Sequence, residues 1–219
     1  MGVRGEPEPS TVLGALTEGP ARLSAEDVAA SQRRRMIAAM IAAVAEKGYV
    51  HVAVADVVKG ARVSRATFYE QFTDKADCFL AAFHACVDDF VGVLRARDPS
   101  ARAPRERLYA LLENYLGALA AFPEGARVCL VEIYAAGPEA ALHRQQIQLD
   151  FVRLVRDLHT ALADAGEPVR PLGGFAFEAL VGAISSLATN YVAAGRTAEL
   201  PELATPLTGF ALTHFGLEP

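Results

Sequence analysis

The sequence predicts an all-α protein, and two observations lead to that prediction. Apolar residues recur three or four positions apart in one segment after another, which is the period of a helix face, and no segment alternates strictly between apolar and polar residues as a half-buried strand does. Glycine and proline end these segments, as at Gly48, Pro99 and Gly137-Pro138. With 219 residues, 52% of them hydrophobic, the chain can bury a sizeable core in one large or two small domains.

The predicted helices follow one another along the whole chain. Ser24 and Asp27 resemble a capping box, so the first helix begins there or, at the latest, near Ser31. Its apolar stripe includes Met36, Met40 and Val44, and Gly48 ends it. Two short helices follow, within residues 52–72. Further helices are expected over about 76–97, 104–122, 125–136, 139–165, 172–194 and 202–215.

The stretch VAVADVVKGARVSRATFYEQFTDK, residues 52–75, predicts a helix-turn-helix with its turn at Arg62. Ser64 can cap the second helix, because its hydroxyl can accept a hydrogen bond from a backbone N–H of the first turn. Phe68 and Phe72 are four residues apart, so they lie on one face and point inward together. The opposite face then carries a cation, a hydroxyl, a phenol and an amide. Such groups suit the major groove of DNA, where a second helix reads base edges and its flanks contact phosphates.

The run GYVHVAVADVVKGARVSRATFYEQFTDKADCF resembles the DNA-binding signature of the tetracycline-repressor (TetR) family of bacterial transcription regulators. The resemblance covers about residues 33–80 and rests on Val63-Ser64, Thr67-Phe68-Tyr69, Phe72 and Asp74-Lys75 at these spacings. Two positions differ from the family. Val52-Ala53 stands where the family usually has a threonine that caps a helix and touches a phosphate, and Arg62 stands where the turn usually carries glycine.

We expect DNA contacts from the turn and the second helix. Ser64, Tyr69 and Lys75 are assigned to phosphates, and residues 65–67 approach base edges. The full set is Arg62, Ser64, Arg65, Ala66, Thr67, Tyr69, Gln71 and Lys75. A net charge of −5 argues against nucleic acid. Within residues 32–71, however, seven cations stand against three acidic side chains. Three of these cations are the run Arg33-Arg34-Arg35, which is either solvated or contacts phosphate.

The last two long segments predict a homodimer. Glu178 is the only charge within residues 175–194, and residues 203–215 have none if His214 is neutral. A helix that is apolar nearly all round must be covered, and a second copy of the chain is the economical cover. Small residues would let the backbones approach; they are Gly182, Ala183, Ser185 and Ser186. The resemblance implies the same four-helix interface, and a two-fold dimer predicts a palindromic operator.

The middle helices are expected to enclose a cavity, since bundle interiors are common pocket sites. The resemblance implies that this domain binds a small effector, which pulls the two DNA-binding heads out of register. Aromatic and aliphatic residues suggest an apolar or aromatic effector, although a residue of this kind is more often plain core than cavity lining. The candidate lining residues are Phe83, Phe90, Tyr109, Leu112, Tyr115, Leu116, Leu119, Ile133, Tyr134, Phe151, Phe175 and Glu178. The candidate polar anchors are Tyr109, Tyr115, Tyr134, Glu178 and Asn190.

Other classes of protein find little support in the sequence. Cys78, Cys86 and Cys129 are scattered, so neither a disulfide framework nor a zinc site is expected, and buried free thiols are the simplest interpretation. Glu139 and His143 lie four apart, but no second pair completes a metal site. No nucleophile elbow or phosphate loop is present, so we expect no cofactor, metal or catalytic residue. With neither a signal peptide nor a membrane span recognisable, we expect a cytoplasmic protein.

These observations predict a flexible arm over residues 1–24, a helix-turn-helix DNA-binding domain over 25–74, and a helical effector-binding and dimerisation domain over 75–219. The first functional hypothesis is a ligand-responsive DNA-binding regulator, a repressor released from its operator by the effector. The second is a helical small-molecule-binding dimer whose helix-turn-helix has weak or no DNA affinity, as the changes at Val52 and Arg62 would allow. In either case the helix from Lys75 would join the head to the cavity.

Overall fold

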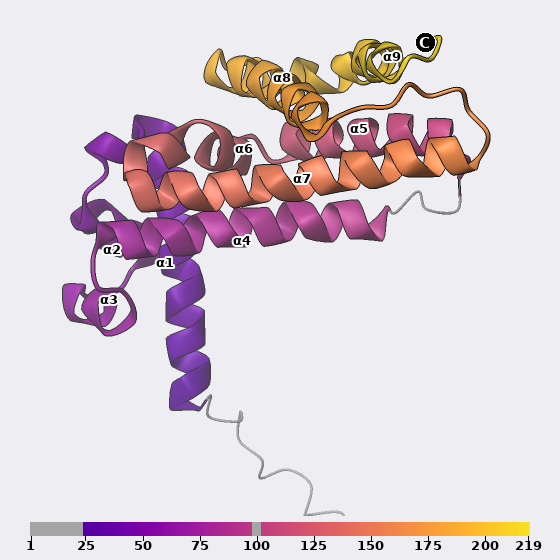
Figure 1. Ribbon diagram of the computed structural model, residues 1–219. Coiled ribbons are helices and arrows are strands. Elements are labelled where there is room, and N and C mark those ends of the chain that lie inside the picture. Colours follow the sequence, from indigo (N-terminus) through magenta and orange to yellow (C-terminus); the bar gives the residue numbers. More distant parts are fainter. Residues whose placement is uncertain (1–23, 98–101) are drawn as a thin grey trace, which may run out of the picture.

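The computed structural model describes residues 24–97 and 102–219, and throughout them every regular element is helical, as predicted (Figure 1). Nearly all of the predicted flexible arm lies outside the described residues. The N-terminal elements are α1 (Ala25–Lys47), the short 3-10 helix η1 (Tyr49–His51), α2 (Val54–Ala61) and α3 (Arg65–Gln71). They are followed by α4 (Lys75–Ala96), α5 (Pro104–Ala121), α6 (Pro123–Leu130), η2 (Glu132–Ala136), α7 (Pro138–Asp164), α8 (Gly174–Ala193), η3 (Thr197–Leu203) and α9 (Ala204–Phe215).

The helices form a long body with the helix-turn-helix at one end. In Figure 1, α4 and α7 run along the length of the body, α8 and α9 form its upper layer, and α2 and α3 lie at the lower left. The first turns of α1 extend away from this body. As predicted, α1 begins with a capping box, in which the Asp27 N–H donates to Ser24 Oγ over 3.0 Å and the Ser24 N–H to Asp27 Oδ2 over 3.1 Å. It ends at Gly48, where φ is +76°.

One predicted helix is wrong in its boundaries. The sequence pattern suggests a single helix over 125–136, but α6 begins at Pro123 and ends at Leu130, and η2 follows it. The break places Glu132 inside the molecule, where its carboxylate bonds with groups that are distant in sequence. The last helix begins two residues later than expected, because the segment with Pro201 forms the 3-10 helix η3 instead.

A single apolar core runs from the helix-turn-helix to α9. Phe68 and Phe72 of the head are buried in it, as predicted, together with Phe79 of α4. The three cysteines are also buried and unpaired, which confirms their interpretation as free thiols. Burial raises the pKa of the Cys78 thiol to about 12. A hydrogen bond with the Cys86 thiol and burial together raise the pKa of the Cys129 thiol.

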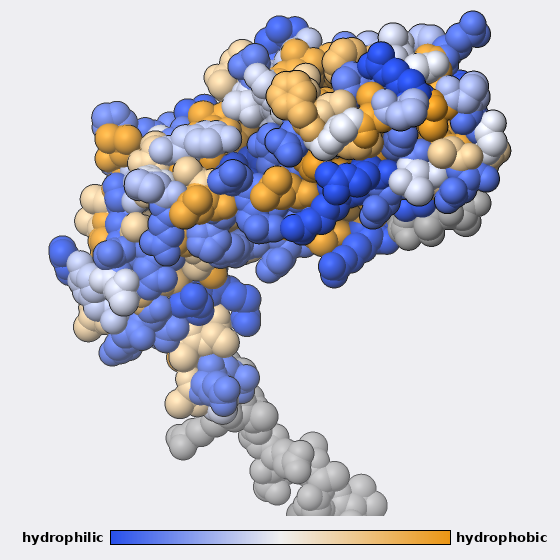
Figure 2. Space-filling model, in the orientation of Figure 1, coloured by the Kyte–Doolittle hydropathy of each residue, from blue (hydrophilic) through white to orange (hydrophobic). Residues whose placement is uncertain are grey.

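The outer surface of α8 is unusually apolar. Of the helices described, α8 alone is long and apolar enough to cross a membrane. A single helix of this kind is weak evidence for a membrane span, because the core helix of a soluble protein has the same length and composition. Its outward face consists mainly of small residues such as Ala179, Ala183 and Ser186, while Phe175 at its start is 82% exposed. In Figure 2, apolar atoms gather on the upper part of the visible face, where α8 and α9 lie, and the helix-turn-helix end is mostly hydrophilic.

Candidate functional site

The outward face of α3 is polar, and Ser64 fixes where the helix begins. Ser64 Oγ accepts a hydrogen bond from the Thr67 N–H over 3.0 Å, which confirms the predicted N-cap. The same hydroxyl lies 2.9 Å from Thr67 Oγ1. Ser64, Arg65, Ala66 and Tyr69 are exposed, whereas Thr67 is half-buried. Four of the residues assigned to DNA from the sequence are therefore accessible at the start and outer face of α3, and the role of the assigned set in binding stays a prediction.

Arg65 and Tyr69 form a pair on this surface. The Arg65 guanidinium donates to the Tyr69 hydroxyl over 3.3 Å, and its central carbon lies 5.6 Å from the Tyr69 ring centre. Both side chains are exposed, so the pair presents a cation and a phenol to solvent. A duplex approaching α3 would meet these groups first, while Gln71 is half-buried at the end of the helix.

Lys75 has a structural role in addition to the phosphate contact predicted for it. Its ammonium donates to the Tyr49 carbonyl over 3.0 Å and lies 4.1 Å from the centre of the Tyr49 ring. The side chain is half-buried. Lys75 is also the first residue of α4, so this contact fixes the start of α4 against η1. An ammonium has three N–H donors, and a phosphate would have to use one of the other two.

The run Arg33-Arg34-Arg35 has a function that neither sequence interpretation considered. Arg33 donates to the Gln71 carbonyl and Arg35 to the Ala61 carbonyl, each over 2.8 Å. These carbonyls lie at the last residues of α3 and α2, where helix carbonyls lack an internal partner and cations are favoured. Two of the three arginines thus hold the helix-turn-helix together. Arg34 is exposed and remains available at the surface.

The two departures from the family pattern have clear structures. Val52 is buried, and Ala53 precedes α2 without a side-chain oxygen; instead the Asp56 carboxylate accepts the Ala53 N–H over 2.9 Å. Asp56 also pairs with Lys47 over 2.7 Å, so Lys47 contributes less free charge than the sequence suggests. Arg62 adopts the left-handed conformation, with φ 54° and ψ 50°, and its side chain is exposed.

A buried carboxylate joins the head to the rest of the chain. Glu132 of η2 accepts the Tyr49 N–H over 2.9 Å and pairs with Arg127 of α6 over 2.8 Å. Only 7% of Glu132 is exposed, whereas 36% of the Arg127 side chain is. Tyr49 is therefore held at both backbone groups, its N–H by Glu132 and its carbonyl by Lys75. The sequence analysis missed Glu132; the only signal was a charge within the apolar run CLVEIY.

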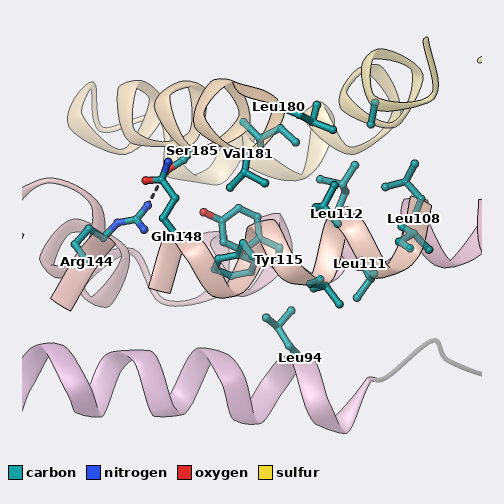
Figure 3. A pocket seen from close by; sticks show the side chains of 16 residues that line it. Leu94, Leu108, Leu111, Leu112, Tyr115, Arg144, Gln148, Leu180, Val181 and Ser185 are labelled. Carbon is teal, nitrogen blue, oxygen red and sulfur yellow. Dashed lines mark hydrogen bonds between the residues drawn. The ribbon is translucent and has the colours of Figure 1, made fainter. Parts of the chain in front are cut away.

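Two adjoining cavities of about 80 and 230 Å³ lie between the long helices. Leucines of α5 and residues of α8 line the smaller cavity, and aromatic residues of α4 with parts of α5, α6 and α7 line the larger. The walls common to both are Leu94, Tyr115, Arg144, Phe151 and Leu154. Figure 3 shows the smaller cavity, with Leu108, Leu112 and Tyr115 from α5 facing Leu180 and Val181 from α8.

Half of the candidate lining residues lie on these walls. They are Phe83, Phe90, Leu112, Tyr115, Leu119 and Phe151. Leu116 and Ile133 are fully buried core residues outside either wall, and Tyr109 instead donates to Glu113 on its own helix. Tyr134 is 57% and Phe175 82% exposed, and Glu178 and Asn190 also face solvent. The expectation that these four contribute to the cavity is corrected, because they lie on outward helix faces or beyond a helix end.

The polar group on the cavity wall that the sequence analysis missed is Arg144 of α7. Arg144 is 5% exposed. One of its terminal guanidinium nitrogens donates to Ser185 Oγ over 2.6 Å (Figure 3), and its Nε–H is buried without an acceptor. A signal existed, since Arg144 interrupts the apolar stripe of α7 formed by Ala140, Ile147 and Phe151. A lone cation at such a position is unusual. Burial raises the pKa of the neighbouring Tyr115 phenol, which keeps that group neutral.

Residues 37–82 match the family model described as bacterial regulatory proteins, tetR family. This region spans about the second half of α1, the helix-turn-helix and the start of α4. This region of the chain is therefore similar to the DNA-binding domain of the TetR family. TetR-family proteins are DNA-binding transcriptional regulators, and the matched region contains the helix-turn-helix that α2 and α3 form here. No curated protein matches the chain.

Solved structures resemble the chain in fold over most of its length. The fatty acid degradation regulator FadR from Bacillus halodurans is 25% identical, with a TM-score of 0.72, covering 83% of this chain and 94% of that one. A tetR-family regulatory protein from Rhodococcus RHA1 is 21% identical, with a TM-score of 0.70 and coverages of 86% and 98%. FadR from Bacillus subtilis, in complex with stearoyl-CoA, is 20% identical, with a TM-score of 0.70 and coverages of 83% and 98%.

Within residues 24–97 and 102–219, no group of three or more metal-ligating side chains could hold an ion. The Glu139 and His143 pair weighed from the sequence does not converge on a site. His143 instead packs edge-on against His84 of α4, with ring centres 4.8 Å apart. Burial and the neighbouring His143 lower the pKa of the His84 imidazole.

Proposed function

We propose that this TetR-family regulator is a cytoplasmic repressor that binds a palindromic operator as a homodimer and leaves it when a small, largely apolar effector enters the cavity. The observation that carries the proposal is the surface of α3. A capped helix holds Arg65, Ala66 and Tyr69 outward while its two phenylalanines anchor it in the core. This arrangement supports assigning residues 25–74 to DNA and residues 75–219 to the effector and the partner subunit.

The DNA-binding part is tested by recovering genomic fragments that the purified protein retains and measuring its affinity for the best of them. Arg65→Ala should weaken binding to that operator by about 1–3 kcal/mol if Arg65 reads a guanine. An equal loss on every sequence, with a shallower dependence on salt, would instead assign Arg65 to a phosphate. Arg95→Ala, at an exposed position of α4 remote from α3, is the control and should bind normally.

Failure to bind any fragment at low salt would contradict the proposal. It would favour the second hypothesis, a small-molecule-binding dimer whose helix-turn-helix has lost DNA affinity. The specific observation behind that hypothesis is the junction before α2, where Ala53 supplies no hydroxyl for a phosphate. Arg62→Ala would then have no effect on DNA, because no DNA affinity exists to be reduced.

The homodimer is supported by the outward face of α8. Ala179, Ala183 and Ser186 leave it nearly flat, and Phe175 extends from its beginning. Two such faces can approach closely and bury apolar surface, at roughly 25 cal/mol per Å². Ala183→Arg should convert the dimer to a monomer in sedimentation equilibrium, while Ala163→Arg, on the exposed side of α7, should leave it intact. A wild-type protein that sediments as a monomer would remove this part of the proposal.

The effector part rests on the two cavities and on their apolar walls. The stearoyl-CoA complex of the Bacillus subtilis FadR supports an apolar ligand for a chain of this fold. Helix α4 reaches from Lys75, which binds the head, to Phe83 and Phe90 on the cavity wall. A ligand that displaces α4 would therefore change the spacing of the two heads. The ligand can shift the equilibrium between the DNA-binding and the released conformation only by as much as its affinities for these two states differ. Equal operator affinity with and without bound ligand would exclude this coupling.

A further inference from the structure

We infer that the cavity binds an amphipathic anion, whose apolar chain fills the space between α4, α5, α7 and α8 and whose carboxylate or phosphate pairs with Arg144. The inference rests on the proposed effector function and specifies the chemical class of the effector. It replaces the tyrosine and glutamate anchors expected from the sequence by a single buried cation. The supporting observations are the position of Arg144, its missing partners and the composition of the walls.

Arg144 lies where the two cavities meet, because it belongs to the walls of both. Its one recorded hydrogen bond goes to the neutral hydroxyl of Ser185. Within residues 24–97 and 102–219 no carboxylate lies within 4.0 Å of it, since the ion pairs found there involve other residues. The nearest acidic wall residue by sequence, Asp150, pairs with Arg153 instead.

A buried cation without a counter-charge is unfavourable, because desolvation of the charge is not offset by a partner. Arginine remains charged at any ordinary pH, so it cannot relieve this cost by losing its proton. An anion that enters the cavity would supply the missing charge and also an acceptor for the Nε–H, which now has none. The planar guanidinium suits two oxygens at once, as carboxylates and phosphates present them.

The rest of the cavity calls for an apolar chain. Leu108, Leu112 and Val181 line the smaller cavity (Figure 3), and Phe83, Phe90 and Leu119 line the larger. The two volumes together lie near the lower end of the roughly 300–1,000 Å³ typical of ligand pockets, which suits a flexible chain better than a bulky ring system. A ligand with one anionic end and an apolar remainder matches a wall with one cation and little other polarity.

The decisive experiment compares dodecanoate with dodecan-1-ol on the full-length, delipidated protein by isothermal titration calorimetry. The two probes share a chain and differ in charge. We expect dodecanoate to bind at least about tenfold more tightly, which corresponds to about 1.4 kcal/mol. Equal affinities of the two probes, together with dodecanoyl-CoA binding that does not depend on Arg144, would overturn the inference. Octanoate and hexadecanoate would then show which chain length fits the cavity.

Variants assign the charge to Arg144. Arg144→Met keeps the length and apolar stem of the side chain, so it should reduce dodecanoate affinity about tenfold and leave dodecan-1-ol unchanged. Arg144→Lys keeps the charge but not the fork and should fall between. Ser185→Ala, which removes only the hydroxyl partner, is the matched control and should retain the preference for the anion. A Met variant that still prefers dodecanoate would contradict the assignment.

The anion has two possible sources, a free carboxylate or the phosphates of an acyl thioester. Dodecanoyl-CoA distinguishes them. If dodecanoyl-CoA binds and loses affinity in Arg144→Met, while dodecanoate does not bind, the anionic group is a phosphate. If dodecanoate binds and loses affinity in Arg144→Met, while dodecanoyl-CoA does not bind, the anionic group is the carboxylate. Operator binding is measured with the same ligands. If the anion binds through Arg144 but operator affinity does not change, the effector function is refuted and the anion site is supported. If dodecan-1-ol alone changes operator affinity, the effector function is supported and the anion site is refuted.

Discussion

Arg62 is the one non-glycine residue with positive φ in the described part of the chain. A left-handed conformation costs an L-residue about 1–2 kcal/mol relative to glycine. Arg62→Gly should therefore raise the free energy of unfolding by about 1 kcal/mol, less the extra freedom that glycine gains in the unfolded chain. Urea unfolding checks this. Arg62→Ala removes the same charge and keeps the strain, so it should leave stability unchanged.

The same two variants separate the functional role of the side chain from its conformation. If the exposed Arg62 cation contacts a phosphate, both variants should bind the operator more weakly and with a shallower salt dependence. If the variants differ in operator affinity while their salt dependence is unchanged, the turn geometry and not the charge matters. A destabilised Arg62→Gly would show that the strain argument is wrong.

His84 predicts a dependence of stability on pH. Its pKa is lowered in the folded protein by burial and by the adjacent His143, so the folded state binds fewer protons than the unfolded state near the ordinary histidine pKa of about 6.5. The stabilising contribution is present above that pH and is lost as pH falls through the folded pKa. The midpoint of urea unfolding should therefore fall when the pH is lowered from neutral to about 5. This fall should be smaller in His84→Asn than in the wild type. A decrease of the same size would remove His84 from the explanation.

At the scale of elements, the two-helix head depends on arginines from α1. Arg33 and Arg35 bond the last carbonyls of α3 and α2, and the Arg33 guanidinium also lies 4.3 Å from the Phe72 ring centre. Hydrogen bonds to charged groups contribute roughly 1.5–3 kcal/mol when well shielded, and less where the donor is half-buried, as Arg33 is, or exposed, as Arg35 is. We expect Arg33→Met and Arg35→Met each to lower the free energy of unfolding by about 1 kcal/mol.

Arg34→Met is the matched control for these variants, because the carbonyl contacts found in the described residues come from Arg33 and Arg35 and not from the arginine between them. It should leave stability nearly unchanged and, if Arg34 contacts phosphate, weaken DNA binding on all sequences. Thermal unfolding followed by circular dichroism measures the first effect and a gel shift the second. If all three variants lost the same stability, the carbonyl contacts would not be what matters.

The sequence predicted what depends on local pattern. The period of apolar residues located every long helix, and the hydroxyl of Ser64 and the spacing of Phe68 and Phe72 set the cap and inner face of α3. It did not predict features whose partners are distant in the chain. Glu132 binds an amide 83 residues away, and Arg33 a carbonyl 38 residues away. No periodicity encodes such pairs, so the break after α6 and the roles of these arginines required the structure.

The candidate site shows the same division. Residues on the outer face of α3 could be named from helix geometry alone, because burial of Phe68 and Phe72 orients the whole helix. The cavity wall could be named only in part, because several helices share apolar faces and the sequence does not say which faces enclose a space. Tyr134 and Phe175 were misplaced for that reason, and Arg144 was overlooked although it stands alone on an apolar stripe.

At the scale of the whole molecule, Glu132 connects the head to the part of the chain that holds the cavity. Its carboxylate bonds the Tyr49 N–H and Arg127, and Cys129 and Leu130, which lie between Arg127 and Glu132, line the larger cavity. Glu132→Ala leaves a buried amide without an acceptor and should lower the free energy of unfolding by about 2 kcal/mol. Hydrogen exchange at Tyr49 should become faster.

The exposed residue Glu124 of α6 provides the control, and Glu124→Ala should change neither quantity. If Glu132 also transmits the state of the cavity, its loss should reduce the difference in operator affinity between the liganded and unliganded protein. Unchanged exchange at Tyr49 in Glu132→Ala would show that the contact does not hold the head in place.

The three shielded thiols have a practical consequence. Alkylating reagents react with the thiolate form of cysteine. Burial keeps Cys78 and Cys129 protonated and inaccessible to the reagent in the closed molecule. Modification can proceed only when the protein opens locally around each sulfur. Cys78 lies near the joint with the head and Cys129 on the cavity wall, so mass spectrometry of the unaltered chain would time the opening of each region separately, with no label introduced.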